Sequence, residues 1–186
     1  PALPSLLGVG LVPTSACAAL GVSPDAPFLA LEWVDGTPLD PKSLRDTERA
    51  EVTLAVARDM GRALGDLHAA GLAHGDVKPH NVLFDRRLRQ ARPIDLGLSE
   101  LVSERRVVGG TPRYLAPEHR GPGPGSDARA RDLWALGLLL AELASSSVAQ
   151  SERPAELALE LRLDARIERI VRPLLRSSAG ARPAAD

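Results

Sequence analysis

The stretch from Leu133 to Ala144 most limits what this chain can fold into, because it is apolar on nearly every face of a helix. Only Glu142 interrupts it. The run is shorter than the roughly 20 apolar residues that a membrane-spanning helix needs, so we expect no membrane span in this chain. A helix without a polar side is normally buried in the middle of a domain. We therefore predict that this segment is the central core helix.

Length and charge add limits on domain number and partners. With 186 residues the chain can bury one sizeable core, and two are not expected. Its formal net charge of -1 gives no basic excess, so we expect no nucleic-acid partner. The single cysteine, Cys17, excludes an internal disulfide and favours a reducing, cytoplasmic compartment. Because the first residue is Pro1 rather than Met, we expect a fragment of a longer protein.

The rest of the chain shows strand and helix patterns around that core segment. Short apolar runs predict strands, and apolar residues repeated every three or four positions predict helices. The predicted strands are Leu3–Leu11, Phe28–Val34, Val82–Phe84 and Ala91–Leu96. The predicted helices run from about Pro41 to Gly71 and over Ala155–Leu175. The predicted loops and linkers are Val12–Pro27, Leu98–Arg113 and Ser145–Pro154. This order predicts an α+β fold, with a mostly helical body and a small sheet.

The segment His74–Leu83 carries side chains that suit phosphoryl transfer. That reaction needs an oriented nucleophile, bound metal ions and neutralised charge on the transferred group, and little covalent chemistry from the protein. Asp76 could orient the attacking hydroxyl and accept its proton. Lys78 would place a positive charge beside the γ-phosphate. The only other lysine among the 23 basic residues is Lys42, so a lysine at this position is notable.

Two further residues have the oxygen ligands that Mg²⁺ prefers. Asn81 lies five positions after Asp76, and Asp95 follows the predicted hairpin. The hairpin would bring Asp95 back beside Asn81. Amide and carboxylate oxygens suit magnesium, so these two residues are candidate metal ligands.

The spacing His-x-Asp-x-Lys-Pro-x-Asn, followed by Asp-x-Gly, resembles the catalytic loop and metal-binding motif of eukaryotic-type protein kinases of the serine/threonine type. The resemblance implies ATP and Mg²⁺ as cofactors and a protein hydroxyl as the acceptor. It makes Asp76 the catalytic aspartate, Lys78 the loop lysine, and Asn81 and Asp95 the metal ligands. The implied fold is a mostly helical C-lobe with a small β-hairpin. The lysine-poor composition suggests a GC-rich, bacterial genome.

The resemblance continues on the C-terminal side of this loop. Thr111–Glu118 resembles the end of an activation segment, and implies a shelf for a protein substrate. In that family Thr111 would hydrogen-bond near Asp76, and Asp132 would brace the catalytic loop. Arg182 would pair with Glu118 in a structural role.

On the N-terminal side, Phe28–Gly36 resembles the last strand of a kinase N-lobe and the hinge that follows it. The main-chain groups of Glu32 and Val34 would then bind the adenine of ATP. Leu31 would be the gatekeeper, and Leu83 would lie beneath the adenine ring. The resemblance implies an N-lobe remnant at residues 1–34 and a C-lobe at residues 35–186.

Two departures from the kinase pattern change what we expect of the activity of the chain and of its activation. No G-x-G-x-x-G sequence precedes the hinge, and no lysine precedes Lys42, so we expect little activity from the chain as given. Gly75 also stands where many kinases have an arginine that contacts a phosphorylated loop. We therefore expect activation to be independent of phosphorylation through that contact, whether at Ser99, Ser103 or Thr111.

Two other function classes remain open. A small-molecule phosphotransferase of the aminoglycoside or choline kinase type would also have His-Gly-Asp, so Gly75 favours it. Lys78 and the segment Thr111–Glu118 argue against it. A pseudokinase scaffold would suit the missing N-lobe motifs. A pure scaffold, however, has no need for Asp76 and its neighbours.

Overall fold

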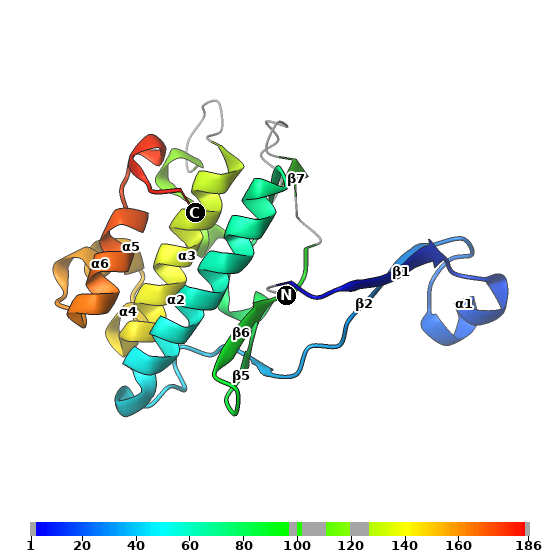
Figure 1. Cartoon of the computed structure of the whole chain (residues 1–186), viewed down its shortest axis with the longest axis horizontal. Coiled ribbons are helices and arrows are strands. Elements are labelled where there is room, and N and C mark those ends of the chain that lie inside the picture. The colour runs from blue at the N-terminus through cyan, green and yellow to red at the C-terminus, as the bar shows by residue number, and fades with distance from the viewer. Residues whose placement is uncertain (1–2, 97–99, 102–110, 120–126, 185–186) are drawn as a thin grey trace.

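The computed structural model describes residues 3–96, 100–101, 111–119 and 127–184 (Figure 1). Its centre is helix α3, Ala128–Ala144, which is buried almost throughout, as predicted. The Asp127 side chain caps its first turn by accepting the N–H of Arg129. Helices α2, Asp46–Ala69, and α6, Ala165–Leu174, pack against α3, so the main core surrounds it. Among the described residues, we find no helix with the length and apolar character that a membrane crossing needs.

Helix α2, Asp46–Ala69, runs beside α3 (Figure 1). Three residues of its apolar face, Val56, Met60 and Leu64, are fully buried. At the start of the helix, the Glu48 carboxylate accepts the backbone N–H of Arg45 at 3.1 Å. The helix ends as predicted, before a left-handed residue, Gly71, with a φ of 77°.

The predicted hairpin is confirmed and sits against α2. Strand β5, Val82–Asp85, pairs antiparallel with β6, Gln90–Pro93. Strand β3, Thr37–Pro38, adds a third member to this sheet beside β5. A separate two-stranded ladder joins β4, Leu72–Ala73, to β7, Glu100–Leu101. Both ladders flank the segment 74–81, which carries the candidate catalytic residues.

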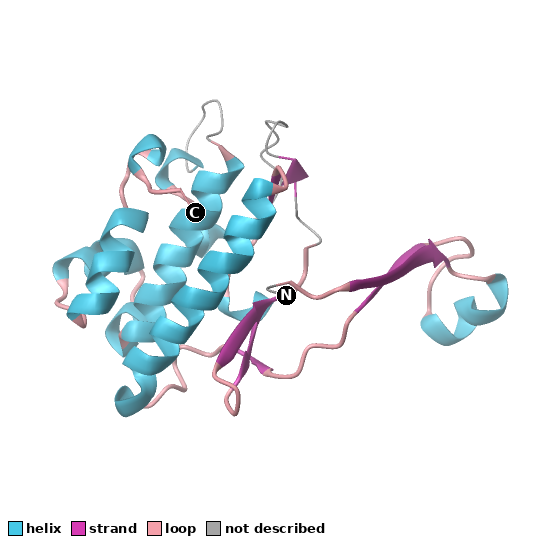
Figure 2. Ribbon diagram, viewed as in Figure 1, coloured by secondary structure: helices cyan, strands magenta, loops and turns pink. Residues whose placement is uncertain are grey.

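The N-terminal strands form a hairpin that extends away from the helical body in Figures 1 and 2. Strand β1, Leu6–Leu11, pairs antiparallel with β2, Pro27–Leu31. The connection holds a short helix, α1, Thr14–Leu20, within a segment that we predicted as a loop with at most residual structure. Many apolar side chains of this hairpin are exposed, including Leu7 at 70% and Leu29 at 69%.

The C-terminal third contains two corrections. The predicted linker Ser145–Pro154 holds helix α4, Ser146–Gln150, because the Ser145 hydroxyl caps it by accepting the N–H of Val148. The single predicted helix over residues 155–175 is two helices, α5, Pro154–Glu160, and α6, Ala165–Leu174. The break falls where Asp164 caps the new helix through the N–H of Arg166 at 2.9 Å.

Four short 3₁₀ turns complete the described structure. They are η1, Pro79–Asn81; η2, Pro112–Tyr114; η3, Pro117–His119; and η4, Ala179–Ala181. Most of the predicted polar segment Leu98–Arg113 lies outside the described residues, as does the glycine- and proline-rich tract that begins at Gly121.

Candidate active site

One buried carboxylate of the core helix holds the candidate catalytic loop, residues 74–81, through hydrogen bonds. Asp132 of α3 accepts the backbone N–H groups of His74 at 2.8 Å and Gly75 at 2.9 Å. It also contacts Nε2 of His68, at the end of α2, at 2.9 Å. The predicted bracing role of Asp132 is therefore confirmed. Gly75 has a φ of 84°, a left-handed conformation that glycine adopts without strain, so the loop turns sharply just before Asp76.

Asp76 lies at the centre of a hydrogen-bonded cluster. Its Oδ2 accepts Nζ of Lys78 at 2.5 Å and Nδ2 of Asn81 at 3.0 Å. Its Oδ1 accepts the hydroxyl of Thr111 at 3.0 Å and the Thr111 backbone N–H at 3.2 Å. The Thr111 hydroxyl also accepts Lys78 Nζ at 3.1 Å, so the predicted contacts of Thr111 are confirmed. The structure thus brings together four residues that span 35 positions of the sequence.

The electrostatics of this cluster favour a charged Asp76. Burial would raise the pKa of the Asp76 carboxyl, but hydrogen bonds from Lys78 and Thr111, with the charge of Lys78, outweigh it and lower that pKa below its usual value. Asp76 is therefore ionised at neutral pH. An ionised carboxylate in this position can accept a hydrogen bond from a hydroxyl, and then its proton.

The two candidate metal ligands are brought together through the backbone. The N–H of Ile94 donates to the carbonyl of Asn81 at 2.8 Å, so Asp95 follows directly after a residue bonded to the loop. Asn81 donates its Nδ2 to both the carbonyl and the carboxylate of Asp76, which leaves its Oδ1 as the amide atom suited to a cation. Asp95 has a φ of 61°, which is costly for a residue other than glycine and is typical of functional sites.

This donor set fits Mg²⁺ held jointly with phosphate oxygens better than a site made of protein ligands alone. In the described part of the chain, no group of three or more histidine, cysteine or acidic side chains could hold a metal. Magnesium in nucleotide sites is usually bound by one or two protein ligands, with phosphates and water completing its coordination. Asn81 and Asp95 match that pattern.

The four residues expected to hold adenine are spread over three elements. Leu31 ends β2 and is 46% exposed, whereas Val34 is buried. Glu32 ties the hinge segment to β6, since its carboxylate accepts Nη1 of Arg92 at 3.1 Å. Its own backbone N–H donates to the carbonyl oxygen of Ser5, the residue before β1, at 2.8 Å. Leu83 lies in the middle of β5. Their binding role stays a prediction.

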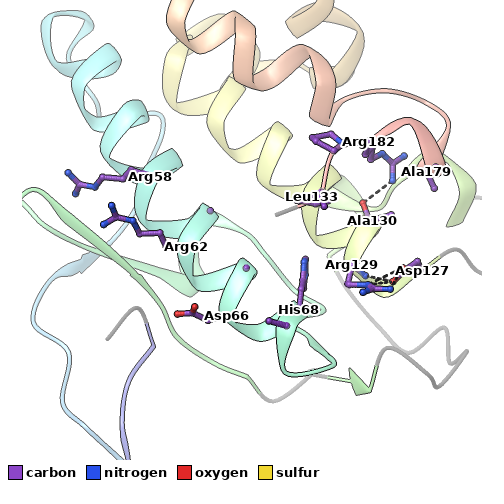
Figure 3. Close-up of a pocket in the computed structure, with 16 residues that line it drawn as sticks. Arg58, Arg62, Asp66, His68, Asp127, Arg129, Ala130, Leu133, Ala179 and Arg182 are labelled. Carbon is purple, nitrogen blue, oxygen red and sulfur yellow. Dashed lines mark hydrogen bonds and ion pairs between the residues drawn. The ribbon is translucent and has the colours of Figure 1, made fainter. Parts of the chain in front are cut away.

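A second ion pair fixes the far end of the activation segment. The Arg182 guanidinium donates to both oxygens of the Glu118 carboxylate, at 2.7 and 2.8 Å, which confirms the predicted pairing. The same side chain donates to the carbonyl of Ala130 at 2.9 Å (Figure 3). Its guanidinium also lies 5.0 Å from the centre of the Trp134 ring. Such a buried bidentate pair holds two distant segments against α3.

Arg182 also borders a surface groove between α2, the start of α3 and η4. Figure 3 shows other lining side chains, among them Arg58, Asp66 and His68 of α2. Asp76 is not among its lining residues, so this groove is separate from the proposed catalytic cluster.

Sequence reasoning missed one polar group next to the site. Arg113 donates Nε to Glu142 of α3 at 2.6 Å, and Tyr114 donates its hydroxyl to the other oxygen of Glu142 at 2.6 Å. A signal was available, because Glu142 is the charged residue inside the otherwise apolar run Leu133–Ala144. A buried carboxylate in such a place needs a partner.

Comparison with known proteins shows the family of this chain. The family model described as the protein kinase domain matches residues 18–178, and the chain belongs to that family. The kinase resemblance of the sequence motifs is therefore confirmed, and so is an α+β kinase fold with a truncated N-lobe.

Individual relatives are serine/threonine-protein kinases. The chain is 38% identical over 140 residues to the DNA damage-responsive serine/threonine-protein kinase RqkA of Deinococcus radiodurans, which covers 69% of this chain and 20% of that protein. It is 33% identical over 133 residues to Pkn1 of Myxococcus xanthus, covering 67% of this chain and 19% of Pkn1. It is 37% identical over 120 residues to PknA of Mycobacterium tuberculosis, covering 60% of this chain and 27% of PknA. The chain thus spans roughly a fifth to a quarter of these relatives' lengths.

Proposed function

We propose that this chain is the C-lobe and hinge of a serine/threonine kinase that transfers the γ-phosphate of ATP to a hydroxyl of a protein. The observation that carries the proposal is the cluster around Asp76, in which Lys78, Asn81 and Thr111 all bond to one ionised carboxylate. Phosphoryl transfer depends mainly on positioning and on charge stabilisation, and the cluster offers both.

Each residue has a distinct task in this proposal. Asp76 orients the acceptor hydroxyl and receives its proton, while Thr111 and Asn81 hold the Asp76 carboxylate in place. Lys78 supplies a positive charge next to the transferred phosphoryl group. Asn81 and Asp95 would hold Mg²⁺, which neutralises charge on the phosphates when bound.

The proposed adenine-binding role of the hinge is supported by the buried position of Val34 and by the ion pair between Glu32 and Arg92. In this proposal the main chain of Glu32 and Val34 binds adenine, Leu31 is the gatekeeper and Leu83 lies beneath the ring. Residues 1–34 would be the N-lobe remnant, and residues 35–186 the C-lobe. The free thiol of Cys17 supports a reducing, cytoplasmic compartment.

The test of the site is binding of Mg-ATP, followed by phosphate transfer to casein, in the natural full-length protein. Asp95→Asn is expected to weaken Mg-ATP binding at least tenfold, since it removes a charged metal ligand. Asp76→Asn is expected to leave binding within about twofold and to lower transfer by roughly 10²- to 10⁴-fold. Asp66→Asn, on the exposed face of α2, is the matched control and should change neither quantity.

Three results would redirect the proposal. Equal Mg-ATP binding by the wild type and Asp95→Asn would favour a scaffold without a metal site. Transfer to kanamycin or choline, with none to casein, would favour a small-molecule phosphotransferase. Phosphotyrosine as the main product would contradict the serine/threonine assignment that Lys78 supports.

A further inference from the structure

The side chain of Arg113 donates four hydrogen bonds although it is partly exposed. It lies in the middle of η2, two positions after Thr111, and its side chain is one-third exposed, at 33%. All three guanidinium nitrogens donate to groups outside its own segment. The acceptors are Glu142 Oε1 at 2.6 Å and the carbonyls of Ser151 at 2.7 Å, Val148 at 3.2 Å and Ala149 at 3.2 Å. We call these contacts the Arg113 anchor.

The carbonyl acceptors come from the end of a helix. Val148 and Ala149 belong to the last turn of α4, and Ser151 is its C-terminal cap. Carbonyl groups in a last helical turn lack the regular helical partner and carry partial negative charge; of these, the Val148 carbonyl also accepts the N–H of Ser151 at 3.1 Å. An arginine satisfies several of them at once, because its guanidinium presents five N–H groups in a fixed plane. The Arg113 anchor therefore joins η2 to the corner between α3 and α4.

The charged acceptor is fully enclosed. The side chain of Glu142 is 4% exposed and sits within the apolar surface of α3. Its second oxygen accepts the hydroxyl of Tyr114, whose pKa is raised by burial and by the nearby Glu142 charge. Two consecutive residues of η2 thus bind both oxygens of one buried carboxylate. Removing either partner would leave part of that charge unsatisfied.

The turn η2 is consequently fixed at both ends. Thr111, just before it, bonds to Asp76 and Lys78 in the catalytic loop. Arg113 and Tyr114 bond to the core helix through Glu142. The polar contacts of Glu142 with η2, and of Thr111 with Asp76, therefore fix the position of η2 relative to Asp76.

We propose that Arg113 is a positioning residue that sets the place of the protein acceptor relative to Asp76. The inference rests on the proposed function, in which Thr111–Glu118 forms the substrate shelf. Arg113 touches neither the reacting hydroxyl nor the nucleotide. It acts through the shelf, so its loss displaces a protein substrate and leaves the nucleotide-binding residues in place. An ångström of misplacement is enough to lower a reaction rate by about a hundredfold.

The experiment separates the handling of protein substrate from that of ATP in the natural full-length protein. We would measure KM and kcat with casein and with ATP, and the rate of ATP hydrolysis without casein. Arg113→Ala removes the anchor, and Arg113→Lys keeps the charge but only one donor group. Arg166→Ala is the matched control, because this arginine is exposed and, within the part of the chain that the structure describes, its side chain bonds to its helix-capping neighbour, Asp164. Amide hydrogen exchange is read in parallel on all three variants.

For Arg113→Ala we expect kcat/KM for casein to fall between about tenfold and a hundredfold. The KM for ATP and the rate of ATP hydrolysis should stay within about twofold. The amides of Tyr114 and Leu115, bonded at 2.8 and 3.3 Å, should exchange faster, whereas the Asn81 amide in the catalytic loop should not. Arg113→Lys should fall between Arg113→Ala and the wild type, and Arg166→Ala should match the wild type.

Other outcomes overturn the proposal. An unchanged kcat/KM for casein in Arg113→Ala would show that the anchor does not place the substrate. Equal losses for casein and ATP would show a general effect on the fold, and if Arg113→Ala does not fold, Arg113→Lys is judged by the same criterion. If the wild type phosphorylates no acceptor, the proposed function fails by itself. The anchor is then decided by amide exchange, where unchanged protection of Tyr114 would refute it.

Discussion

Asp76 keeps its negative charge in a place where few of its atoms contact water. Its side chain is 8% exposed, yet two donors from Thr111 and one from Lys78 satisfy its oxygens, with Asn81 completing the set. A carboxylate with this many donors loses little by leaving water, because each donor replaces a hydration contact. Thr111 has a special part here, because its single hydroxyl donates to the Asp76 carboxylate and accepts from the Lys78 ammonium group.

Replacing Thr111 with valine keeps the shape of the side chain and removes its hydroxyl. We expect the pKa of Asp76 to rise toward its usual value, and the protein to lose about 1.5 to 3 kcal/mol of unfolding free energy at neutral pH. A carboxyl whose folded-state pKa is lowered stabilises the fold above its unfolded-state pKa, and this stabilisation disappears as the pH falls through the folded-state pKa. The difference between Thr111→Val and the wild type should therefore shrink in acid.

Carbon-detected NMR titration of the Asp76 carboxyl checks this expectation, with urea unfolding at neutral and acid pH. Thr111→Ser is the control, because it retains the hydroxyl and should keep the lowered pKa. If the valine and serine variants titrate alike, the hydroxyl does not hold the charge of Asp76.

At the level of the elements, α3 is the part to which the site is attached. Asp132 holds the catalytic loop, Glu142 holds η2, and the carbonyl of Ala130 binds Arg182. The position of this helix depends on close packing against α6. A Cβ atom on Gly137 would lie 2.8 Å from Cβ of Leu174 and 3.0 Å from Cδ2 of Leu175, so only glycine fits here without movement.

Two glycine-to-alanine substitutions compare this contact with an open helix surface. Gly137→Ala should lower the unfolding free energy by roughly 1 kcal/mol, because overpacking outweighs the gain in helix propensity. Gly61→Ala on α2 should raise it by about 0.5 to 1 kcal/mol, since nothing lies within 4 Å of its added Cβ. Urea denaturation of both variants provides the measurement. Equal effects of the same sign would mean that α3 and α6 are not closely packed at Gly137.

The sequence patterns predicted some elements and missed others for definite reasons. The long helix with buried Met60 and the hairpin at Val82 follow from apolar periodicity, which is a local property. Helix α4 has five residues and no apolar repeat, so only its Ser145 cap pointed to it. The break at Asp164 was hidden because the surrounding residues are all good helix formers.

The candidate site divides in the same way. Asp76 and Asn81 were predictable because they lie in one short motif, and Thr111 followed from the resemblance to kinases. The partnership of Arg113 with Glu142 could not be predicted from spacing, because the two lie 29 positions apart and Glu142 belongs to no recognised motif. The hinge residues were predicted by resemblance alone, and the fold places Leu31 on an exposed strand.

Considered as a whole, the molecule has a large apolar surface at one end. Besides Leu7 and Leu29, Val9 of the N-terminal hairpin is 65% exposed, and it faces Leu29 across the two strands. In the residues that the structure describes, the sheet has only these two strands, so each has an outer edge without a paired strand. Apolar surface and open strand edges together favour association.

We expect the 186-residue chain to associate increasingly as its concentration rises. Combining Leu7→Lys, Val9→Lys and Leu29→Lys should give a monomer, because the lysines add charge repulsion to a surface that is now apolar. The unfolding free energy of the helical body should change by less than about 0.5 kcal/mol. Sedimentation velocity at several concentrations tests this. The control is Leu88→Lys, which changes an apolar residue, 51% exposed, in the β5–β6 turn and should leave association as it was.

The position of Asp132 also has a consequence for the order in which the protein takes shape during synthesis. The catalytic loop leaves the ribosome 58 residues ahead of the carboxylate that holds His74, and Glu118 leaves 64 residues ahead of Arg182. Until α3 has emerged, the loop lacks the two bonds to Asp132 that hold His74 and Gly75. A nascent chain would therefore carry the whole motif before the carboxylate that holds its loop has been made.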